Sequence, residues 1–157
     1  TIEVKLYKFS ELSDKAKDRA ISDYRDNETE YHFWSDAIAS LEAFGARFNV
    51  STFNYEISPY SHSWINSSAD AANFRGVKLK DFTGDEMPTG YCSDCPLWNT
   101  FYIEFKNLSN AQFAFEKAIN AWLKDVLADM EDSDSDERIA ENIECNEYEF
   151  DEKGVMV

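Results

Sequence analysis

The chain has 157 residues, of which 43% are hydrophobic, 15% aromatic and 29% charged. This length and apolar content predict one compact domain, residues 1–157, and exclude a wholly disordered chain. The 15 Lys and Arg residues against 31 Asp and Glu residues give a net charge of −16. Such an excess of negative charge repels DNA, RNA and anionic lipid, so we expect no direct binding to nucleic acid or to a membrane.

The chain shows no sign of a membrane span or of export. No stretch comes near the roughly 18 uncharged apolar residues that mark a candidate span. The opening TIEVKLYKFS also lacks the apolar core of a signal peptide. The chain has three cysteines, and an odd number argues against a framework of paired disulfides. Unpaired cysteines are typical of a reducing compartment. We therefore expect a cytoplasmic protein.

The first third of the chain predicts a strand followed by two helices. Residues 2–9 alternate apolar side chains between two faces, as a partly covered opening strand does. Residues 12–26 repeat their apolar side chains at helical spacing, and Ser13 is a favourable N-terminal cap. Residues 28–45 repeat aromatic and aliphatic side chains in the same way, and Gly45 predicts a left-handed stop at the end of that helix.

The middle of the chain is less regular. Residues 47–57 are rich in β-branched and aromatic residues and predict a second strand. Residues 58–94 are rich in turn-forming residues, and within them residues 74–82 predict one short edge strand. Residues 95–107 fit both a helix and a strand, but the acidic residue just before them and the proline at their start favour a helix.

The last third predicts two more helices and a hairpin. Residues 110–131 carry a broad apolar stripe and should form the longest helix. Residues 137–146 predict a short helix that Ser135 caps, with acidic residues near the positive end of the helix dipole. The chain then ends in a hairpin pattern around Gly154, which can take the positive φ that such a turn requires.

These elements predict an α+β fold. The sheet is expected to be small and mainly antiparallel, built from the strands at residues 2–9, 47–57 and 74–82 and extended by the terminal hairpin. The helices pack against this sheet. The terminal residues 147–157 are expected to be anchored on it by four apolar side chains: Tyr148, Phe150, Val155 and Val157.

The strongest feature of the sequence is the acid-rich segment Asp125–Glu152. It holds 13 acidic residues and a single basic residue, Arg138, so its net charge of −12 makes up most of the protein's −16. On a helix, Glu137, Glu141 and Glu144 lie along one face at axial steps of roughly 6 and 4.5 Å.

A second acidic row follows directly. An extended strand over residues 147–151 projects Glu147, Glu149 and Asp151 to one side at steps of roughly 6.7 Å. Both rows approximate the spacing of every second phosphate along a DNA strand, whose phosphates are about 3.4 Å apart. The segment therefore predicts a folded face that occupies the DNA groove of a partner protein. The predicted partner-binding residues are Asp132, Asp134, Asp136, Glu137, Glu141, Glu144, Glu147, Glu149 and Asp151.

Two other interpretations of the acidic segment exist. A solvated acidic surface keeps a protein soluble, but carboxylates concentrated in one segment repel one another, and dispersing them would serve solubility better. The spacing of Asp132, Asp134 and Asp136 is similar to the start of a calcium-binding loop. An EF-hand is excluded, because that loop needs a Gly and a bidentate Glu where this chain has Glu137 and Ile143.

Cys92 and Cys95 form a single Cys-x-x-Cys pair. A structural zinc site needs two more ligands, which only His62 and Cys145 could supply if the fold brought them near. A redox pair is the other possibility, although no clear βαβ pattern surrounds it. We expect ordinary loop or packing cysteines, with no metal and no cofactor.

Few residues suit catalysis. His32 and His62 are the two histidines, and neither lies in a recognisable catalytic motif. We therefore predict no catalytic residue and a protein that is not an enzyme. Aromatic residues are enriched at interface hot spots, and an alternative protein-binding surface would use four of them: Tyr55, Tyr60, Trp64 and Tyr91.

Two segments resemble a known group of proteins. YKFSELSDKAKDRAISDYRD, followed shortly by a tryptophan-containing helix, is similar to the opening of small acidic proteins encoded by phages and prophages. ERIAENIECNEYEFDEKG is similar to the ending of the same group, and together the segments cover about a quarter of the chain. The resemblance implies a viral accessory protein. Many of these are acidic inhibitors of host defence, among them anti-CRISPR and antirestriction proteins that imitate DNA.

Charge pattern and resemblance together predict a stoichiometric inhibitor of a host defence protein that binds nucleic acid. Its acidic C-terminal face would occlude a basic groove without any chemical step, and aromatic residues would add specificity. Two alternatives stay open: an antitoxin or other regulatory protein-binding partner, and a small metal-dependent or redox protein that uses Cys92 and Cys95.

Overall fold

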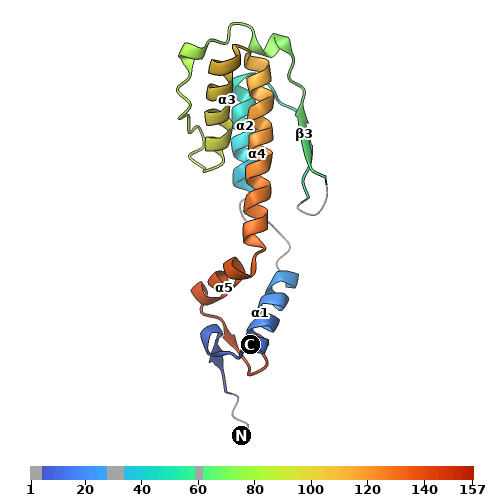
Figure 1. Ribbon diagram of the computed structural model, residues 1–157, viewed down its shortest axis with the longest axis vertical. Coiled ribbons are helices and arrows are strands. Elements are labelled where there is room, and N and C mark those ends of the chain that lie inside the picture. The colour runs from blue at the N-terminus through green and yellow to red at the C-terminus, as the bar shows by residue number, and fades with distance from the viewer. Residues whose placement is uncertain (1–4, 28–33, 59–61) are drawn as a thin grey trace. The chain divides into compact units, whose positions relative to one another are not determined.

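The computed structural model describes residues 5–27, 34–58 and 62–157. These residues form five α-helices and two separate two-stranded antiparallel sheets (Figure 1), which confirms the α+β fold class. The helices are α1 (Asp14–Asn27), α2 (Trp34–Arg47), α3 (Asp94–Leu108), α4 (Ala111–Ser133) and α5 (Asp136–Cys145). The strands are β1 (Tyr7–Lys8), β2 (Phe53–Glu56), β3 (Trp64–Ser67) and β4 (Glu149–Phe150).

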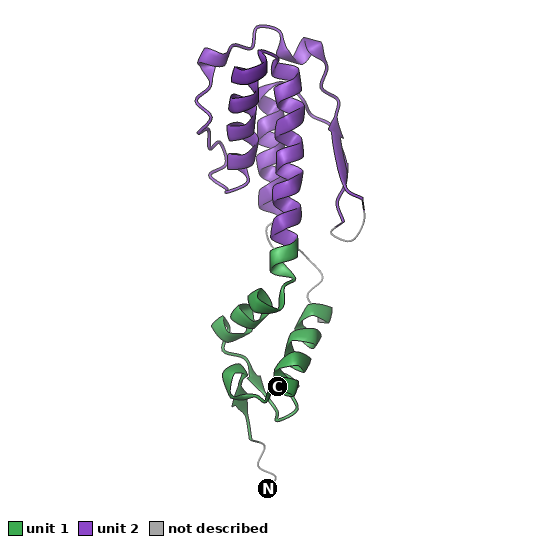
Figure 2. Ribbon diagram, viewed as in Figure 1, with its two compact units in different colours: residues 1–31, 131–157 green, residues 32–130 purple. Residues whose placement is uncertain are grey.

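The chain divides into two compact units (Figure 2). Unit 1 contains residues 1–31 and 131–157, so it joins the two ends of the chain, and unit 2 contains residues 32–130. The single domain expected from the chain length stays a prediction, because cooperative unfolding, not compactness alone, is what defines it.

Unit 1 packs α1 against α5 around a small, mostly aliphatic core. β1 pairs with β4 through Tyr7 opposite Phe150, which ties the start of the chain to its end. Ser13 caps α1 as predicted, accepting a hydrogen bond from the backbone N–H of Ala16 at 3.2 Å. The buried core residues are Phe9, Leu12, Ala16, Ala20, Ile139, Ile143 and Phe150.

The terminal hairpin is present in a shortened form. Phe150 forms an isolated antiparallel bridge with Met156, and Gly154 has the expected positive φ, 86°. A Cβ atom at Gly154 would lie 2.2 Å from the carbonyl oxygen of Ala16, so the turn closes directly against α1. Phe150 is buried as expected, whereas Val157 is 74% exposed and is not an apolar anchor.

Unit 2 packs α2, α3 and α4 side by side (Figure 1) around aromatic rings. Phe44 of α2 stacks on Phe115 of α4 with ring centres 5.0 Å apart. The indole N–H of Trp122 donates a hydrogen bond to the backbone carbonyl of Ala37 at 2.9 Å. The predicted long helix and its apolar stripe are confirmed, because four of its residues are fully buried: Phe115, Ile119, Trp122 and Val126.

The segment that joins α2 to β2 differs from its prediction. Gly45 lies inside α2, and the left-handed conformation falls four residues later, at Asn49 (φ 58°). Gly45 is needed for a different reason: a Cβ atom there would lie 2.6 Å from the carbonyl oxygen of Val50 and 2.7 Å from the Phe53 ring. The strand expected over residues 47–57 is shortened to β2, since a turn occupies its first part.

The strand expected at residues 74–82 is wrong. The chain there forms two short 3₁₀ turns, Ala71–Phe74 and Leu79–Asp81, and Gly76 between them has a φ of 74°. Phe82 is buried and packs on the aromatic core of unit 2 rather than on a neighbouring strand. The sequence pattern is that of an edge strand, but the loop is held by the packing of Phe82 on the aromatic core.

The strands also pair differently from the expectation. β1 pairs with β4, and β2 pairs with β3, with Phe53 opposite Ser67. The first two predicted strands therefore belong to different units. Parts of two predictions lie outside the described residues: the opening of the strand over residues 2–9, and the start of the helix over residues 28–45.

Residues 95–107 are helical, as part of α3. Asp94 begins this helix and is fully buried. Its carboxylate accepts hydrogen bonds from the backbone N–H groups of Thr89 and Gly90, at 3.1 and 3.0 Å, and from the Thr89 hydroxyl at 2.9 Å. This network fixes the loop before α3 to the first turn of the helix.

Candidate protein-binding site

α5 presents glutamates outward and isoleucines inward. Ile139 and Ile143 are buried in the core of unit 1. Glu137, Glu141 and Glu144 are exposed, and their spacing of four and three residues places them on one face of the helix. The helical row expected from the sequence is therefore present, and the buried isoleucines hold it in place.

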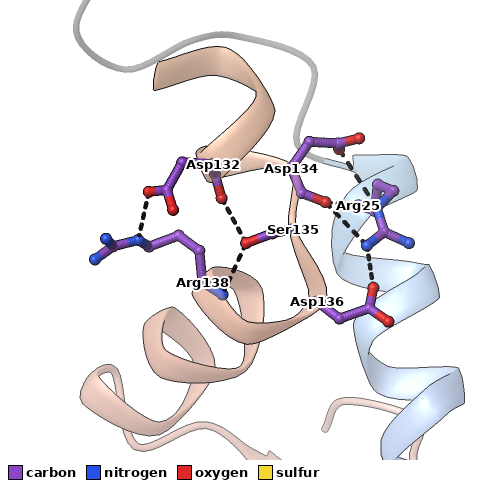
Figure 3. A network of polar contacts seen from close by, with 6 residues as sticks. All are labelled: Arg25, Asp132, Asp134, Ser135, Asp136 and Arg138. Carbon is purple, nitrogen blue, oxygen red and sulfur yellow. Dashed lines mark hydrogen bonds and ion pairs between the residues drawn. The ribbon is translucent and has the colours of Figure 1, made fainter. Parts of the chain in front are cut away.

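Arg25 of α1 binds the residues at the start of α5 (Figure 3). Its guanidinium donates a hydrogen bond to the backbone carbonyl of Asp134 at 3.0 Å and lies 3.4 Å from the carboxylate of the same residue. It also forms an ion pair with the carboxylate of Asp136. These two predicted site residues thus attach α5 to α1.

Arg138 forms a second cluster on the same helix. Its guanidinium donates to the carboxylate of Asp132 at 3.0 Å and to that of Glu141 at 3.3 Å. The Ser135 hydroxyl accepts from the backbone N–H of Arg138 at 3.3 Å and donates to the Asp132 carbonyl at 2.7 Å (Figure 3), so the predicted cap is confirmed. The one basic residue of the acidic segment thus pairs with two of its acids.

The second predicted row, over residues 147–151, does not have the expected geometry. Glu147 has a positive φ of 55° in the turn after α5. This conformation breaks the strand alternation that would have aligned Glu147 with Glu149 and Asp151. Glu147 and Glu149 are exposed, but they do not continue a regular row.

Asp151 closes the terminal turn. Its carboxylate accepts hydrogen bonds from the backbone N–H groups of Val155 at 3.0 Å and Lys153 at 2.9 Å. These donors, that of Val155 above all, stabilise the charged form and hold the pKa of Asp151 below its ordinary value of 3.8. The structure therefore gives Asp151 a role in the fold of the hairpin.

The remaining predicted residues present carboxylates to solvent. Unit 1 has 19 acidic and 8 basic residues, a net charge of −11, whereas unit 2 has 12 acidic and 7 basic residues, a net charge of −5. Four of the predicted site residues are exposed and make no ion pair or side-chain hydrogen bond within the described part of the chain: Glu137, Glu144, Glu147 and Glu149.

The cysteines have a neighbour that their spacing did not predict. Cys92, Cys95 and Cys145 are exposed free thiols. Among residues 5–27, 34–58 and 62–157, no group of three or more His, Cys, Asp or Glu side chains could hold a metal ion. The Cys95 sulfur instead lies 3.7 Å from the sulfur of Met87.

Tyr60 lies outside the described residues, and the other three aromatic candidates lie in unit 2. Tyr55 and Trp64, on β2 and β3, are 38% and 39% exposed, and Tyr91 is 42% exposed. The Tyr55 ring also lies 5.6 Å from that of Trp34, so part of it packs within the unit. The exposed parts of Tyr55, Trp64 and Tyr91 are therefore accessible to a partner protein, as an alternative to the acidic face of α5.

Sequence reasoning missed an open surface pocket of about 560 Å³ in unit 2. Arg47, Phe82, Met87 and Trp98 are among the residues that line it. The Arg47 guanidinium lies 5.0 Å from the centre of the Phe82 ring, and the buried indole nitrogen of Trp98 has no hydrogen-bond partner in the described chain. The lining comes from separate segments, so no local pattern signals it.

Two further findings bear on function. No helix in the described parts of the chain combines the length and the apolar character needed to cross a membrane. Comparison of the chain with protein-family models, with curated proteins and with solved structures found no match. The resemblance to small acidic phage proteins therefore stays a prediction.

Proposed function

We propose that the outer face of α5 docks into the basic groove of a nucleic-acid-binding protein and blocks it. One observation carries this proposal: Glu137, Glu141 and Glu144 share a face of a helix whose opposite face is buried. A row of charges held at steps of roughly 6 and 4.5 Å loses little conformational freedom on binding. A mobile acidic tail of the same charge would lose much more.

The ion pairs divide the acidic residues into two roles. Asp134 and Asp136 hold α5 against α1 through Arg25, and Asp132 pairs with Arg138. We assign these aspartates to positioning. Glu137 and Glu144, which make no ion pair in the described chain, are the groups proposed to meet Lys and Arg side chains of the partner. Glu141 lies between them in the row and pairs with Arg138.

The partner class follows from charge. A net charge of −11 on unit 1 favours encounter with a basic surface. The two segments that resemble phage-encoded proteins cover most of α1 and α5. On that basis the proposed partner is a host defence protein in the cytoplasm, and the proposed mechanism is occlusion, which requires no catalysis.

The test is affinity capture from a host-cell lysate with the immobilised chain, followed by elution with a short DNA duplex. A variant with Glu137→Lys and Glu144→Lys should lose the captured protein, because both contacts become repulsive. The matched control, Glu42→Lys with Glu116→Lys, makes the same charge change at exposed positions of α2 and α4. It should keep the captured protein.

Salt provides an independent measure of the same contact. Capture should weaken steeply as the Debye length falls from roughly 30 Å at low salt to about 8 Å at physiological ionic strength. If the α5 variant captures the partner as well as the control does, or if duplex DNA fails to release it, the proposed groove mimicry is wrong.

A second candidate is a regulatory protein-binding role, such as that of an antitoxin, exercised through β2 and β3. The partial exposure of Tyr55 and Trp64 favours it. In this case Tyr55→Ser with Trp64→Ser should abolish capture while the α5 variant retains it, and DNA should not compete. Circular dichroism of the aromatic variant controls for loss of the Tyr55 packing.

A further inference from the structure

Three exposed sulfur-containing residues lie in the first turn of α3 and in the loop before it. The Cys95 sulfur lies 3.7 Å from the Met87 sulfur, and all three residues, Met87, Cys92 and Cys95, are exposed. The backbone N–H of Cys95 donates to the carbonyl of Cys92 at 3.1 Å, so the two cysteines occupy one turn. Residues at the ends of such a turn have Cα atoms less than about 7 Å apart.

The loop that carries Met87 is fixed on both sides. Before it, the Glu86 carboxylate accepts hydrogen bonds from the backbone N–H groups of Thr83 at 2.6 Å and Gly84 at 2.9 Å. After it, the buried Asp94 carboxylate binds the N–H groups of Thr89 and Gly90. The approach of Met87 to Cys95 is therefore built into the loop.

We propose that Cys92, Cys95 and Met87 bind one Cu(I) ion. Thiolates and thioethers are soft ligands that select Cu(I). Two metal–sulfur bonds of about 2.3 Å join sulfurs 3.7 Å apart at an angle of roughly 110°. Structural zinc would need a fourth strong ligand, whereas two thiolates and one thioether suit a soft ion of low coordination number.

The binding step is an exchange of protons for the metal ion. Each cysteine thiol releases its proton to solvent as its sulfur bonds to Cu(I), and no electron is transferred. Cys95 lies in the first turn of the 15-residue α3, and Cys92 lies two residues before the helix. This site is in unit 2 and is independent of the proposed acidic interface.

The test is an anaerobic titration of the full chain with Cu(I) in competition with the colorimetric chelator bicinchoninate. The wild-type chain should take one Cu(I). Cys95→Ser and Cys92→Ser should abolish this uptake, and Met87→Leu should weaken it by about tenfold, close to 1.4 kcal/mol. The control, Cys145→Ser, removes the third exposed thiol and should leave binding unchanged.

A second measurement uses only the wild-type chain, so it does not depend on whether a variant folds. One equivalent of Cu(I) should protect Cys92 and Cys95 from alkylation by iodoacetamide, while Cys145 stays reactive, as mass spectrometry of the peptides would show. Equal protection of all three cysteines, or Cu(I) affinity unchanged in Met87→Leu, would overturn the assigned ligand set.

Discussion

Unit 1 and unit 2 are stabilised by different interactions. In unit 2, Phe44, Phe48 and Phe115 are fully buried, with ring centres 5.0 to 5.6 Å apart. In unit 1, Phe9 meets Phe150 edge-on at 6.3 Å, and the rest of the core is mostly Ala and Ile. Unit 1 is also the more charged part, with −11 against −5 for unit 2.

The difference indicates that the acidity of unit 1 is not there to stabilise it. Like charges repel and weaken a compact state, and this cost falls on the unit with the smaller core. Arg25 and Arg138 offset part of it by pairing with four carboxylates. The proposed interface on α5 would give this charge excess a role.

The largest effects should come from truncating the two cores. Phe44→Ala should lower the free energy of unfolding by about 3–5 kcal/mol and Ile143→Ala by about 2–5 kcal/mol, since each leaves a cavity where a fully buried side chain was. Denaturant titration measures the loss. Hydrogen exchange resolved by segment shows where protection is lost.

The same two variants test the predicted single domain. If residues 1–157 unfold as one cooperative domain, Phe44→Ala should lower amide protection in unit 1 as much as in unit 2. Protection lost only in unit 2, with unit 1 unchanged, would show that the two units unfold separately. Ile143→Ala gives the reciprocal comparison from unit 1.

The elements predicted most accurately are those determined by local sequence. α1, α4 and α5 follow from apolar side chains at helical spacing and from the caps Ser13 and Ser135. Tertiary packing decides the rest. Gly45 has the sequence pattern of a helix stop, yet it is there because Val50 and Phe53 approach it closely. The loop with Phe82 has the sequence pattern of a strand, but Phe82 packs on rings that are distant in the sequence, such as that of Phe48.

The candidate site was predictable to the same degree. The face of α5 with Glu137, Glu141 and Glu144 follows from periodicity alone. The pairing of Asp136 with Arg25 joins residues 111 positions apart, and no single-sequence pattern contains it. The turn at Glu147 was missed because a left-handed Glu is uncommon.

A smaller effect is expected from the ion pairs of Arg25. Arg25→Met should destabilise unit 1 by about 1 kcal/mol at low salt and by less at high salt, because the pairs are partly exposed. The matched control is Arg19→Met, which removes an exposed pair with Asp23 within α1. Thermal melts at two salt concentrations measure both variants. An equal, salt-independent loss in both would indicate that Arg25 acts through packing instead.

The smallest effects should appear in the pH dependence, with opposite signs in the two units. Burial, and then the charge of Asp129, raises the pKa of Asp125 above 3.8, so its contribution to stability is complete below pH 3.8 and is lost as the pH rises through the raised pKa. The lowered pKa of Asp151 gives the reverse: its contribution is present above pH 3.8 and is lost as the pH falls through the lowered pKa. We expect the melting temperature, measured between about pH 2 and 6, to depend less on pH in both variants. In Asp125→Asn the dependence should weaken at the alkaline end of this range, and in Asp151→Asn at the acid end. Shifts of the same sign in both variants would contradict the assignment.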